Sequence, residues 1–386
     1  SIASFSLSEQ KQCLFFPTVK DGFSGQVVVN TMNHRKESFD TEYDAKATLD
    51  AARHSTIHVQ AVHPEDNMGT NLADELTPLN YYTILSDEEP ASVYTNANLR
   101  SFRITQPLQI NMENDSLHMR FYSPVGIKEV TVMAKSPTMD EYVEFVYIDN
   151  IPAFADIKTS IKVLEKGLYR TESGKVLQFS AEEMNPAALS LRIACNDPYW
   201  TKISQIKAKW YIKFVLNGGN PVTGTPNKNW WGIRPVHCRE AVALFLNIGY
   251  MCTLEKFQQR VSTFQGTFLD NNRYPVDTST LISRLENLSG FDIGLIYSGN
   301  GVSGLGGGRT WGVYQKSFLY HYENSGGCCS TIFHELGHCL GYSHNSTMTY
   351  GQWASGCADV FYKNNIKDFP VNSHTILKSR SNPNIY

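Results

Sequence analysis

HELGHCLGYSH, residues 334–344, matches the pattern H-E-x-x-H-x-x-G-x-x-H in one unbroken run. On a helix, His334 and His338 lie four residues apart and project from the same face, so both imidazoles reach one ion. Gly341 suits a left-handed turn that ends the helix and brings His344 back as a third ligand. Three neutral imidazoles leave the fourth position of Zn²⁺ open for water. The pattern therefore predicts a catalytic zinc site.

Glu335 follows the first of these histidines and is predicted to act as a general base. Its place in the pattern lets it hold and deprotonate a water at the metal without binding the metal itself. The alternative is an ordinary amphipathic helix whose histidines match the motif by chance. Five fixed positions in eleven residues make coincidence rare, so the zinc interpretation is favoured.

Other donors for the third ligand position fit less well. No glutamate follows Glu335, and the remaining downstream carboxylates, Asp359 and Asp368, stand in no ligand motif. His374 lacks the spacing of His344. A thiolate site is disfavoured because the eight cysteines form no C-x-x-C pair.

The motif, together with Ser346–Gly351 (STMTYG), resembles the metzincin clan of zinc peptidases. The resemblance implies a methionine turn, in which Met348 forms the hydrophobic floor beneath the ligands. It also implies that Tyr350 binds the zinc at rest or stabilises the oxyanion. Only three residues separate His344 from Met348 and the residue after the third histidine is Asn345, so the family within the clan is unassigned.

The sequence upstream of the motif also resembles a metzincin. Phe291–Ser298 is a short apolar run that predicts a buried strand, followed by a glycine-rich loop, Gly304–Gly308, and by Thr310–Tyr314. The resemblance implies an edge strand here that binds the substrate as an extended strand through backbone hydrogen bonds. A phosphate-binding loop is disfavoured because no Gly-Lys-Ser/Thr follows the glycines.

We expect an α+β protein in which a metzincin-like α/β catalytic domain spans residues 203–386. Its first strand is predicted within Ile206–Leu216. Helical patterns follow over Val236–Leu246, Leu254–Val261 and Thr278–Leu288, and Asp277 is the expected N-cap of the last helix. The segment after the methionine turn is expected to form the far wall of the cleft.

Residues 1–202 are predicted to form a β-rich accessory region of β-sandwich type, which a boundary near residue 100 would divide into two modules. A helical passage is expected near Asp44–Arg53. The region carries no catalytic motif, so a scaffold, a glycan- or protein-binding module and a latency segment stay open. The β-type runs are Gly25–Asn30, Ser101–Thr105, Leu117–Tyr122, Ile127–Ala134, Tyr142–Ile148 and Ala188–Ala194.

Composition limits the class of protein. The chain has 386 residues, 41% hydrophobic and 18% charged, which is ordinary for globular domains. A net charge of −3 gives no basic surface for nucleic acid, and the longest apolar run, Ala241–Met251, is too short to span a membrane. The start at Ser1 and the eight cysteines favour a mature secreted, cell-surface or periplasmic form. Cys339 is expected to form a disulfide with Cys328, Cys329 or Cys357.

The sequence thus predicts an exported zinc metalloendopeptidase that cleaves proteins or glycoproteins. The alternative is a catalytically silent surface protein that uses the same domain and the β-rich region for protein or glycan binding. The intact Glu335 favours the enzyme. A zinc hydrolase acting on a non-peptide amide is a third hypothesis, which cleavage tests on peptides would separate from the first.

Replacing His344 with alanine is predicted to weaken zinc binding and activity together, because two imidazoles would remain to hold the ion. Metal content after dialysis and turnover of a protein substrate measure the two effects. Full activity in the variant would show that another residue is the third ligand.

Overall fold

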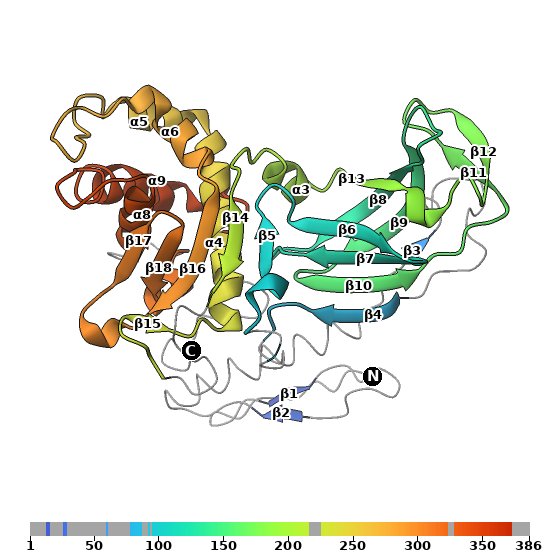
Figure 1. Ribbon diagram of the computed structural model, residues 1–386, viewed down its shortest axis with the longest axis horizontal. Coiled ribbons are helices and arrows are strands. Elements are labelled where there is room, and N and C mark those ends of the chain that lie inside the picture. Colours follow the sequence, from blue (N-terminus) through green and yellow to red (C-terminus); the bar gives the residue numbers. More distant parts are fainter. Residues whose placement is uncertain are drawn as a thin grey trace. The chain divides into compact units, whose positions relative to one another are not determined.

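The computed structural model describes residues 78–86, 92, 95–215, 225–322 and 328–372, together with three short strands, β1 (Cys13–Phe15), β2 (Gln26–Val28) and β3 (Val59–Gln60) (Figure 1). The structure is mixed α and β and divides into two compact units. The unit that we call the α/β unit takes in the described residues of 1–50 and 85–106 and those from 202 onward. The β unit takes in the described residues of 51–84 and 107–201.

A six-stranded sheet forms the centre of the α/β unit. Its three inner strands are parallel, whereas the two outermost strands run antiparallel to their neighbours. In spatial order the sheet contains β17 (Gly304–Gly307), β18 (Thr310–Tyr314), β16 (Gly290–Ile296), β14 (Tyr211–Phe214) and β5 (Ser101–Arg103), and β15 (Trp230–Trp231) pairs with β16.

Glycines in this sheet leave room for close packing. Gly294 and Gly312 are direct register partners on β16 and β18. A Cβ on Gly312 would lie 2.5 Å from the ring of Trp230, so the indole packs directly on the backbone. Gly290, at the start of β16, has a φ of 141°, and a Cβ there would collide with the backbone of Tyr211. The pairing of β16 with β14 therefore requires glycine at position 290.

Helix α4 (Pro235–Thr253) packs against the sheet and is buried along its length. The ring of Phe245 lies 5.0 Å from that of Phe291 on β16 and 4.9 Å from that of Trp311 on β18, centroid to centroid. Asn247 bonds the Val371 backbone in both directions and donates to the hydroxyl of Tyr362. The helix thus ties the segment near residue 371 to the core of this unit.

Short helices complete the α/β unit, and those from residue 255 onward are yellow to red in Figure 1. Asp277 caps α6, since its carboxylate accepts the Ser279 N–H, as the sequence predicted. These elements are α3 (Pro198–Ile203), which begins in the β unit, α5 (Glu255–Ser262), α6 (Thr278–Glu286), α7 (Gln315–Leu319), α8 (Cys328–Cys339), α9 (Val360–Asn365), the π-helix η4 (Ala354–Asp359) and the 3₁₀ turns η1 (Ala97–Leu99), η3 (Ser298–Asn300) and η5 (Ile366–Asp368).

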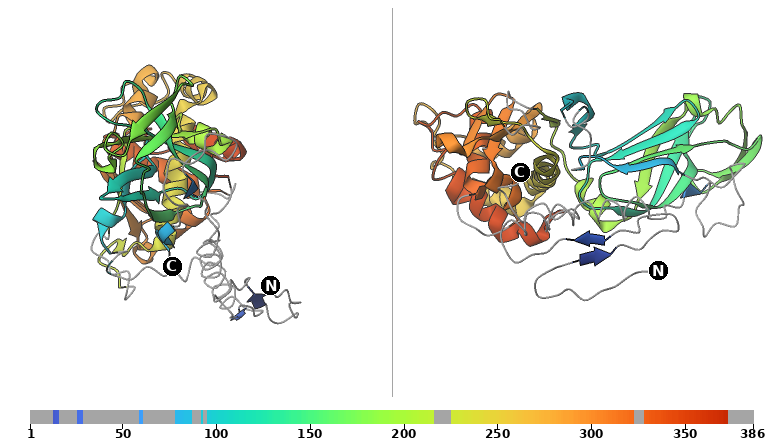
Figure 2. Two further views of the ribbon diagram at one scale, coloured as in Figure 1. Left: turned by 90° about the vertical axis from the view of Figure 1, so that its right-hand side faces the viewer. Right: turned by 90° about the horizontal axis from the view of Figure 1, so that it is seen from below.

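The β unit contains two four-stranded antiparallel sheets and a two-stranded hairpin (Figure 2). One hydrophobic cluster draws residues from both sheets, among them Met119, Phe121, Phe145 and Ile148. The first sheet has the spatial order β4 (Pro78–Thr83), β10 (Ala155–Ser160), β7 (Ser116–Phe121) and β6 (Leu108–Glu113). The second sheet has the order β13 (Ser190–Cys195), β8 (Ile127–Lys135), β9 (Val143–Ile151) and β3. The hairpin consists of β11 (Lys166–Arg170) and β12 (Val176–Ser180), and a 3₁₀ turn, η2, spans Pro186–Ala188.

Within the described residues the predicted strands and helices are present with shifted ends, and the two compact units divide the chain differently from the predicted boundary near residue 203. Residues 85–106 were assigned with the rest of 1–202, whereas the structure groups them with the α/β unit because β5 pairs with β14. The chain then leaves this unit after residue 106 and returns at 202. The helical passage expected near 44–53 lies outside the described residues. None of the described helices has the length and apolar character needed to cross a bilayer.

Replacing Gly290 with alanine is predicted to lower the free energy of unfolding by about 3 kcal/mol, through backbone strain plus collision with Tyr211. Gly266 is the matched control, since its φ of 84° is also positive but no atom lies within 4 Å of the place that a Cβ would take. There alanine should cost about 1 kcal/mol. Chemical denaturation measures both, and equal losses would contradict the packing argument.

Candidate metal centre

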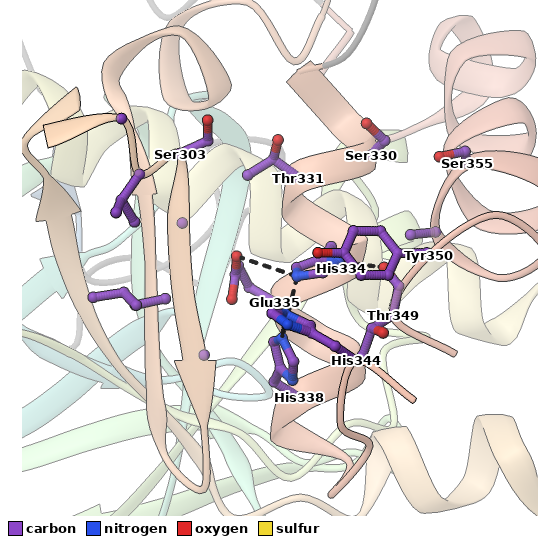
Figure 3. Close-up of a pocket in the computed structure, with 16 residues that line it drawn as sticks. Ser303, Ser330, Thr331, His334, Glu335, His338, His344, Thr349, Tyr350 and Ser355 are labelled. Carbon is purple, nitrogen blue, oxygen red and sulfur yellow. Dashed lines mark hydrogen bonds and ion pairs between the residues drawn. The ribbon is translucent and has the colours of Figure 1, made fainter. Parts of the chain in front are cut away.

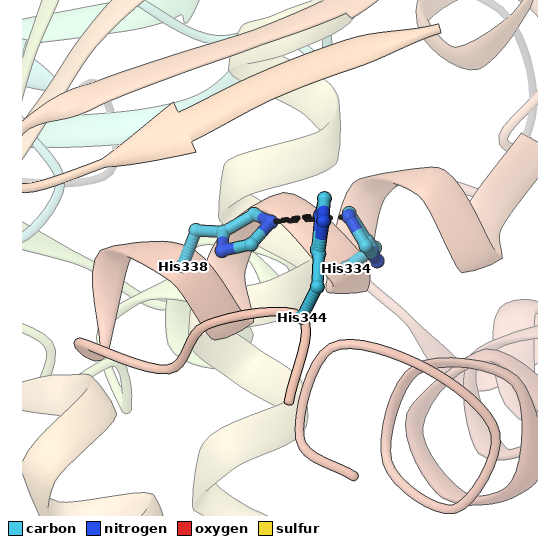
Figure 4. Close-up of side chains that lie close together, drawn as sticks. All are labelled: His334, His338 and His344. Carbon is cyan, nitrogen blue, oxygen red and sulfur yellow. Dashed lines mark hydrogen bonds between the residues drawn. The ribbon is translucent and has the colours of Figure 1, made fainter. Parts of the chain in front are cut away.

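The imidazoles of His334, His338 and His344 converge in the α/β unit (Figure 4). The Nε2 of His338 lies 3.1 Å from the Nε2 of His334 and 3.0 Å from the Nε2 of His344. One nitrogen from each ring therefore faces the same small volume, and the three residues form a group that is able to hold a metal ion. The structure brings together all three ligands that the sequence predicted.

Backbone carbonyls orient two of the rings. The Nδ1 of His334 donates to the Thr349 carbonyl, and the Nδ1 of His338 donates to the Tyr342 carbonyl at 2.7 Å. A proton fixed on Nδ1 leaves the Nε2 lone pair free for a metal. Burial lowers the pKa of both imidazoles below their ordinary value of 6.5. Both rings are thus favoured in the neutral form that metal binding requires.

The turn after α8 returns the chain to the site. Gly341 has a φ of 95°, so the left-handed turn expected from the sequence is confirmed. The Tyr342 N–H donates to the Gly337 carbonyl at 3.1 Å, which closes the end of the helix. This turn reverses the chain and places His344 beside the two helical histidines.

Glu335 is buried beside the histidines, with 3% of its side chain exposed. Its Oε1 lies 3.9 Å from the Nε2 of His334, and its Oε2 has no hydrogen-bond partner within the described structure. Burial raises the pKa of this carboxyl from 4.5 to about 8. An unsatisfied, buried carboxyl next to a set of metal ligands is arranged to exchange a proton.

Strand β17 lies against Glu335, and it corrects the expectation that Gly304–Gly308 is a loop. Residues 304–307 pair with β18 in antiparallel register and form one edge of the sheet. A Cβ on Gly304 would collide with the Glu335 carboxylate, and one on Gly306 would lie 2.5 Å from the Glu335 carbonyl oxygen. Glycine is therefore required here by the close approach of α8, although it disfavours strands in general.

Met348 and Tyr350 both lie at the centre. Met348 is fully buried, and its carbonyl oxygen packs so closely on Gly337 of α8 that a Cβ there would collide with it. Tyr350 is 55% exposed. Its ring centroid lies 4.6 Å from that of His334 and 5.1 Å from that of His344. The phenol is thus next to two of the predicted ligands and accessible from the solvent.

A cavity of about 490 Å³ opens over the three histidines (Figure 3). Glu335 and Tyr350 line it, together with the backbone of β17. Hydroxyl groups predominate among its other side chains, which belong to Ser303, Ser330, Thr331, Thr349 and Ser355. Ala354 and Ser355 also line it, so the segment after Tyr350 forms part of its wall.

A second cavity, of about 560 Å³, lies on the other side of the metal centre. It shares Gly306, His338 and His344 with the first and is otherwise lined by Gly307 and the segment from Gly341 to Asn345. Open space thus extends along β17 on both sides of the three imidazoles.

The expected disulfide at Cys339 is wrong. Cys339 is a free cysteine, and its thiol donates to the Thr310 carbonyl on β18 at 3.3 Å. Cys357 is also free. The helical position of Cys339 turns its thiol away from the histidines and into the contact with the sheet, where burial raises its pKa to about 12. It is therefore neither a metal ligand nor a cross-link.

Several contributors to the site carry no signal in the sequence. The carbonyls of Tyr342 and Thr349 orient the rings through the backbone, which any residue possesses. Gly304 and Gly306 were noticed as a glycine run, but their contact with Glu335 depends on the tertiary structure.

Comparison of the chain with protein-family models, with curated proteins and with solved structures finds no match.

Proposed function

We propose that this protein is a zinc-dependent endopeptidase of the metzincin clan that hydrolyses peptide bonds of proteins or glycoproteins. One observation carries the proposal: three imidazole nitrogens converge next to a buried carboxyl, at the edge of a sheet. Each part of this arrangement has a role in hydrolysing an amide held as an extended strand.

Zinc is the metal that the donors fit. His334, His338 and His344 would hold it through Nε2 atoms, and neutral imidazole is a preferred ligand of Zn²⁺. The carbonyl partners of His334 and His338 are the kind of support that zinc-binding histidines usually have. When bound, zinc supplies Lewis acidity that activates water and polarises a carbonyl.

Glu335 is the proposed general base. It accepts a proton from the attacking water and passes that proton to the leaving amine, so the carboxyl returns to its starting state. Burial raises the pKa of this carboxyl above that of an exposed glutamate, and a zinc ion held beside it would lower that pKa again, which favours the carboxylate form that accepts the proton. Tyr350, accessible at the rim beside His334, is proposed to donate a hydrogen bond to the oxyanion of the tetrahedral intermediate.

Strand β17 is the proposed substrate-binding element. It is the last strand of its sheet, paired with β18 on one side. Among the described residues no strand pairs with its other side, so its outer backbone groups are available to an added strand. Backbone pairing binds a peptide with little demand on its sequence. The two cavities flanking the metal centre would then take the side chains on either side of the cut.

The β unit is proposed to be a β-sandwich accessory module, and the protein to act as a secreted, cell-surface or periplasmic enzyme. The shared core of the two sheets supports the sandwich. The runner-up function is a surface protein that binds protein or glycan without turnover. The retained Glu335, buried and placed at the three histidines, favours the enzyme.

Replacing Glu335 with alanine is predicted to abolish turnover while zinc is retained, because the ligands remain and the base is lost. Wild type and variant are incubated with mixed peptides and glycoproteins, with and without a chelator, and the products are identified by mass spectrometry. Cuts that require both Glu335 and metal would support the endopeptidase. Zinc-loaded wild type that makes no cuts would instead favour the binding protein.

Replacing Gly304 with alanine is predicted to lower turnover by about 100-fold or more, since the new methyl group displaces the Glu335 carboxylate. Zinc affinity should stay near that of wild type, because the atoms nearest to the new methyl group belong to Glu335 and not to a histidine. Gly307→Ala is the control on the same strand: its φ is positive, at 148°, so alanine strains the backbone there, but its Cβ would meet no atom within 4 Å and would leave Glu335 in place. Equal kcat losses in the two variants would contradict the role of the contact.

A further inference from the structure

The segment that carries His344 contacts a hairpin of residues 268–276, which we call the clamp hairpin. The hairpin is closed by a bridge between Leu269 and Pro275 and by a hydrogen bond from the Val276 N–H to the Phe268 carbonyl at 2.8 Å. It precedes α6 in the chain, and its residue Asn271 lies 70 residues before Gly341 and 72 residues before Ser343.

The clamp hairpin is internally well braced. The carboxylate of Asp270 accepts the N–H groups of Asn272 at 2.8 Å and Tyr274 at 2.9 Å, which fixes the tip. Phe268, fully buried, anchors the base through ring contacts with Phe264 and Trp353 at centroid distances of 4.9 and 5.8 Å. Trp353 directly precedes the pocket residue Ala354, so the hairpin is anchored in the core behind the site.

Asn271, at the tip, bonds to both ends of the turn that reverses the chain toward His344. Its Nδ2 donates to the Gly341 carbonyl at 3.1 Å, and its Oδ1 accepts the Ser343 N–H at 2.6 Å. One rigid amide thus fixes the separation of residues 341 and 343. The Ser343 N–H immediately precedes the third ligand in the chain.

The other side of His344 is held by the same hairpin. Arg273 donates to the Asn345 carbonyl at 3.0 Å. The backbone N–H of Leu269 donates to the Thr347 hydroxyl at 2.7 Å, and the Thr347 N–H returns a bond to the Leu269 carbonyl at 3.1 Å. His344 therefore sits between two stretches of backbone that are both attached to the clamp hairpin.

His344 needs such external support more than the other two ligands do. His334 and His338 stand on α8 and are oriented by carbonyls through Nδ1. His344 is exposed and follows a turn, and among the described residues no hydrogen bond anchors its Nδ1. Its place in the centre must come from the backbone on either side.

We propose that Asn271 is a positioning residue for the metal centre, which sets the place of His344 without touching the metal. The inference rests on the metal site of the proposed function. Pre-setting the third ligand lowers the conformational entropy lost when an ion is bound, so Asn271 raises affinity through His344 alone. Residues that support metal ligands in this way commonly contribute about 10- to 100-fold to affinity.

A double-mutant cycle with Zn²⁺ alone tests this role. Asn271→Ala is expected to raise the zinc Kd, measured by chelator competition, by about 10- to 100-fold. In the His344→Ala background the same change should leave the Kd unaltered, because the ligand on which Asn271 acts is gone. Asn271→Asp keeps the acceptor for the Ser343 N–H and loses the donor to Gly341, so its Kd should lie between those of wild type and Asn271→Ala.

Asn272→Ala is the matched control, since Asn272 is the exposed neighbour and its hydrogen bond to Asp270 uses the backbone N–H. It should bind zinc as wild type does. The visible absorption of the Co²⁺-loaded protein gives a second readout: Asn271→Ala should shift it toward the spectrum of His344→Ala. Metal-free Asn271→Ala and Asn272→Ala should unfold at similar denaturant concentrations.

A wild-type Kd in Asn271→Ala, or an equal loss of affinity in the His344→Ala background, would overturn the positioning role. Other results would be expected if the proposed function itself were wrong. If wild-type protein binds no zinc, the metal centre itself is wrong and this inference falls with it. If the cycle behaves as expected but no peptide is cut, the centre and Asn271 stand while the endopeptidase does not.

Discussion

The arrangement of the candidate site depends on three imidazole nitrogens meeting at one point, and several elements of the α/β unit hold them there. Two of them are fixed by a single helix, α8, and by the carbonyls of Thr349 and Tyr342. The third depends on a left-handed turn at Gly341 and on the clamp hairpin. Because His344 lies beyond the end of α8, its position depends on how the turn at Gly341 and the clamp hairpin hold the chain.

The same packing explains why the edge strand is made of glycine. Strand β17 lies so close to α8 that side chains at positions 304 and 306 would occupy the space of Glu335. The contact buries the carboxyl, and burial in turn raises its pKa. One close approach therefore keeps side chains off the strand at two positions and buries a carboxyl beside it. Substrate binding and proton transfer, as proposed, share one structural cause.

The sequence predicted the parts of the site that depend on local spacing. The four-residue separation of His334 and His338 and the glycine at 341 are geometric facts of a helix and its end. By contrast, Gly304–Gly308 was expected to be a loop, because glycine disfavours strands unless a tertiary contact requires it. The pairing of β5 with β14 joins segments separated by the β unit, so no local pattern indicated it.

Cys339 and Asn271 both show that the sequence pattern does not reveal tertiary contacts. Cys339 was expected to be cross-linked, but its thiol faces β18 and its sequence neighbours gave no sign of that contact. Asn271 lies far from the motif in sequence and is an exposed asparagine in a turn, which is an ordinary place for that residue. Its two bonds to the His344 turn are visible only in three dimensions.

X-ray absorption spectroscopy at the zinc edge of the metal-loaded protein would determine the ligands of the proposed centre. We expect one zinc per chain with three imidazole nitrogens and one exchangeable oxygen, at about 2.0 to 2.1 Å. His344→Ala should reduce the imidazole scattering by one ring. A sulfur shell near about 2.3 Å, or four protein ligands with no exchangeable position, would contradict an open catalytic centre.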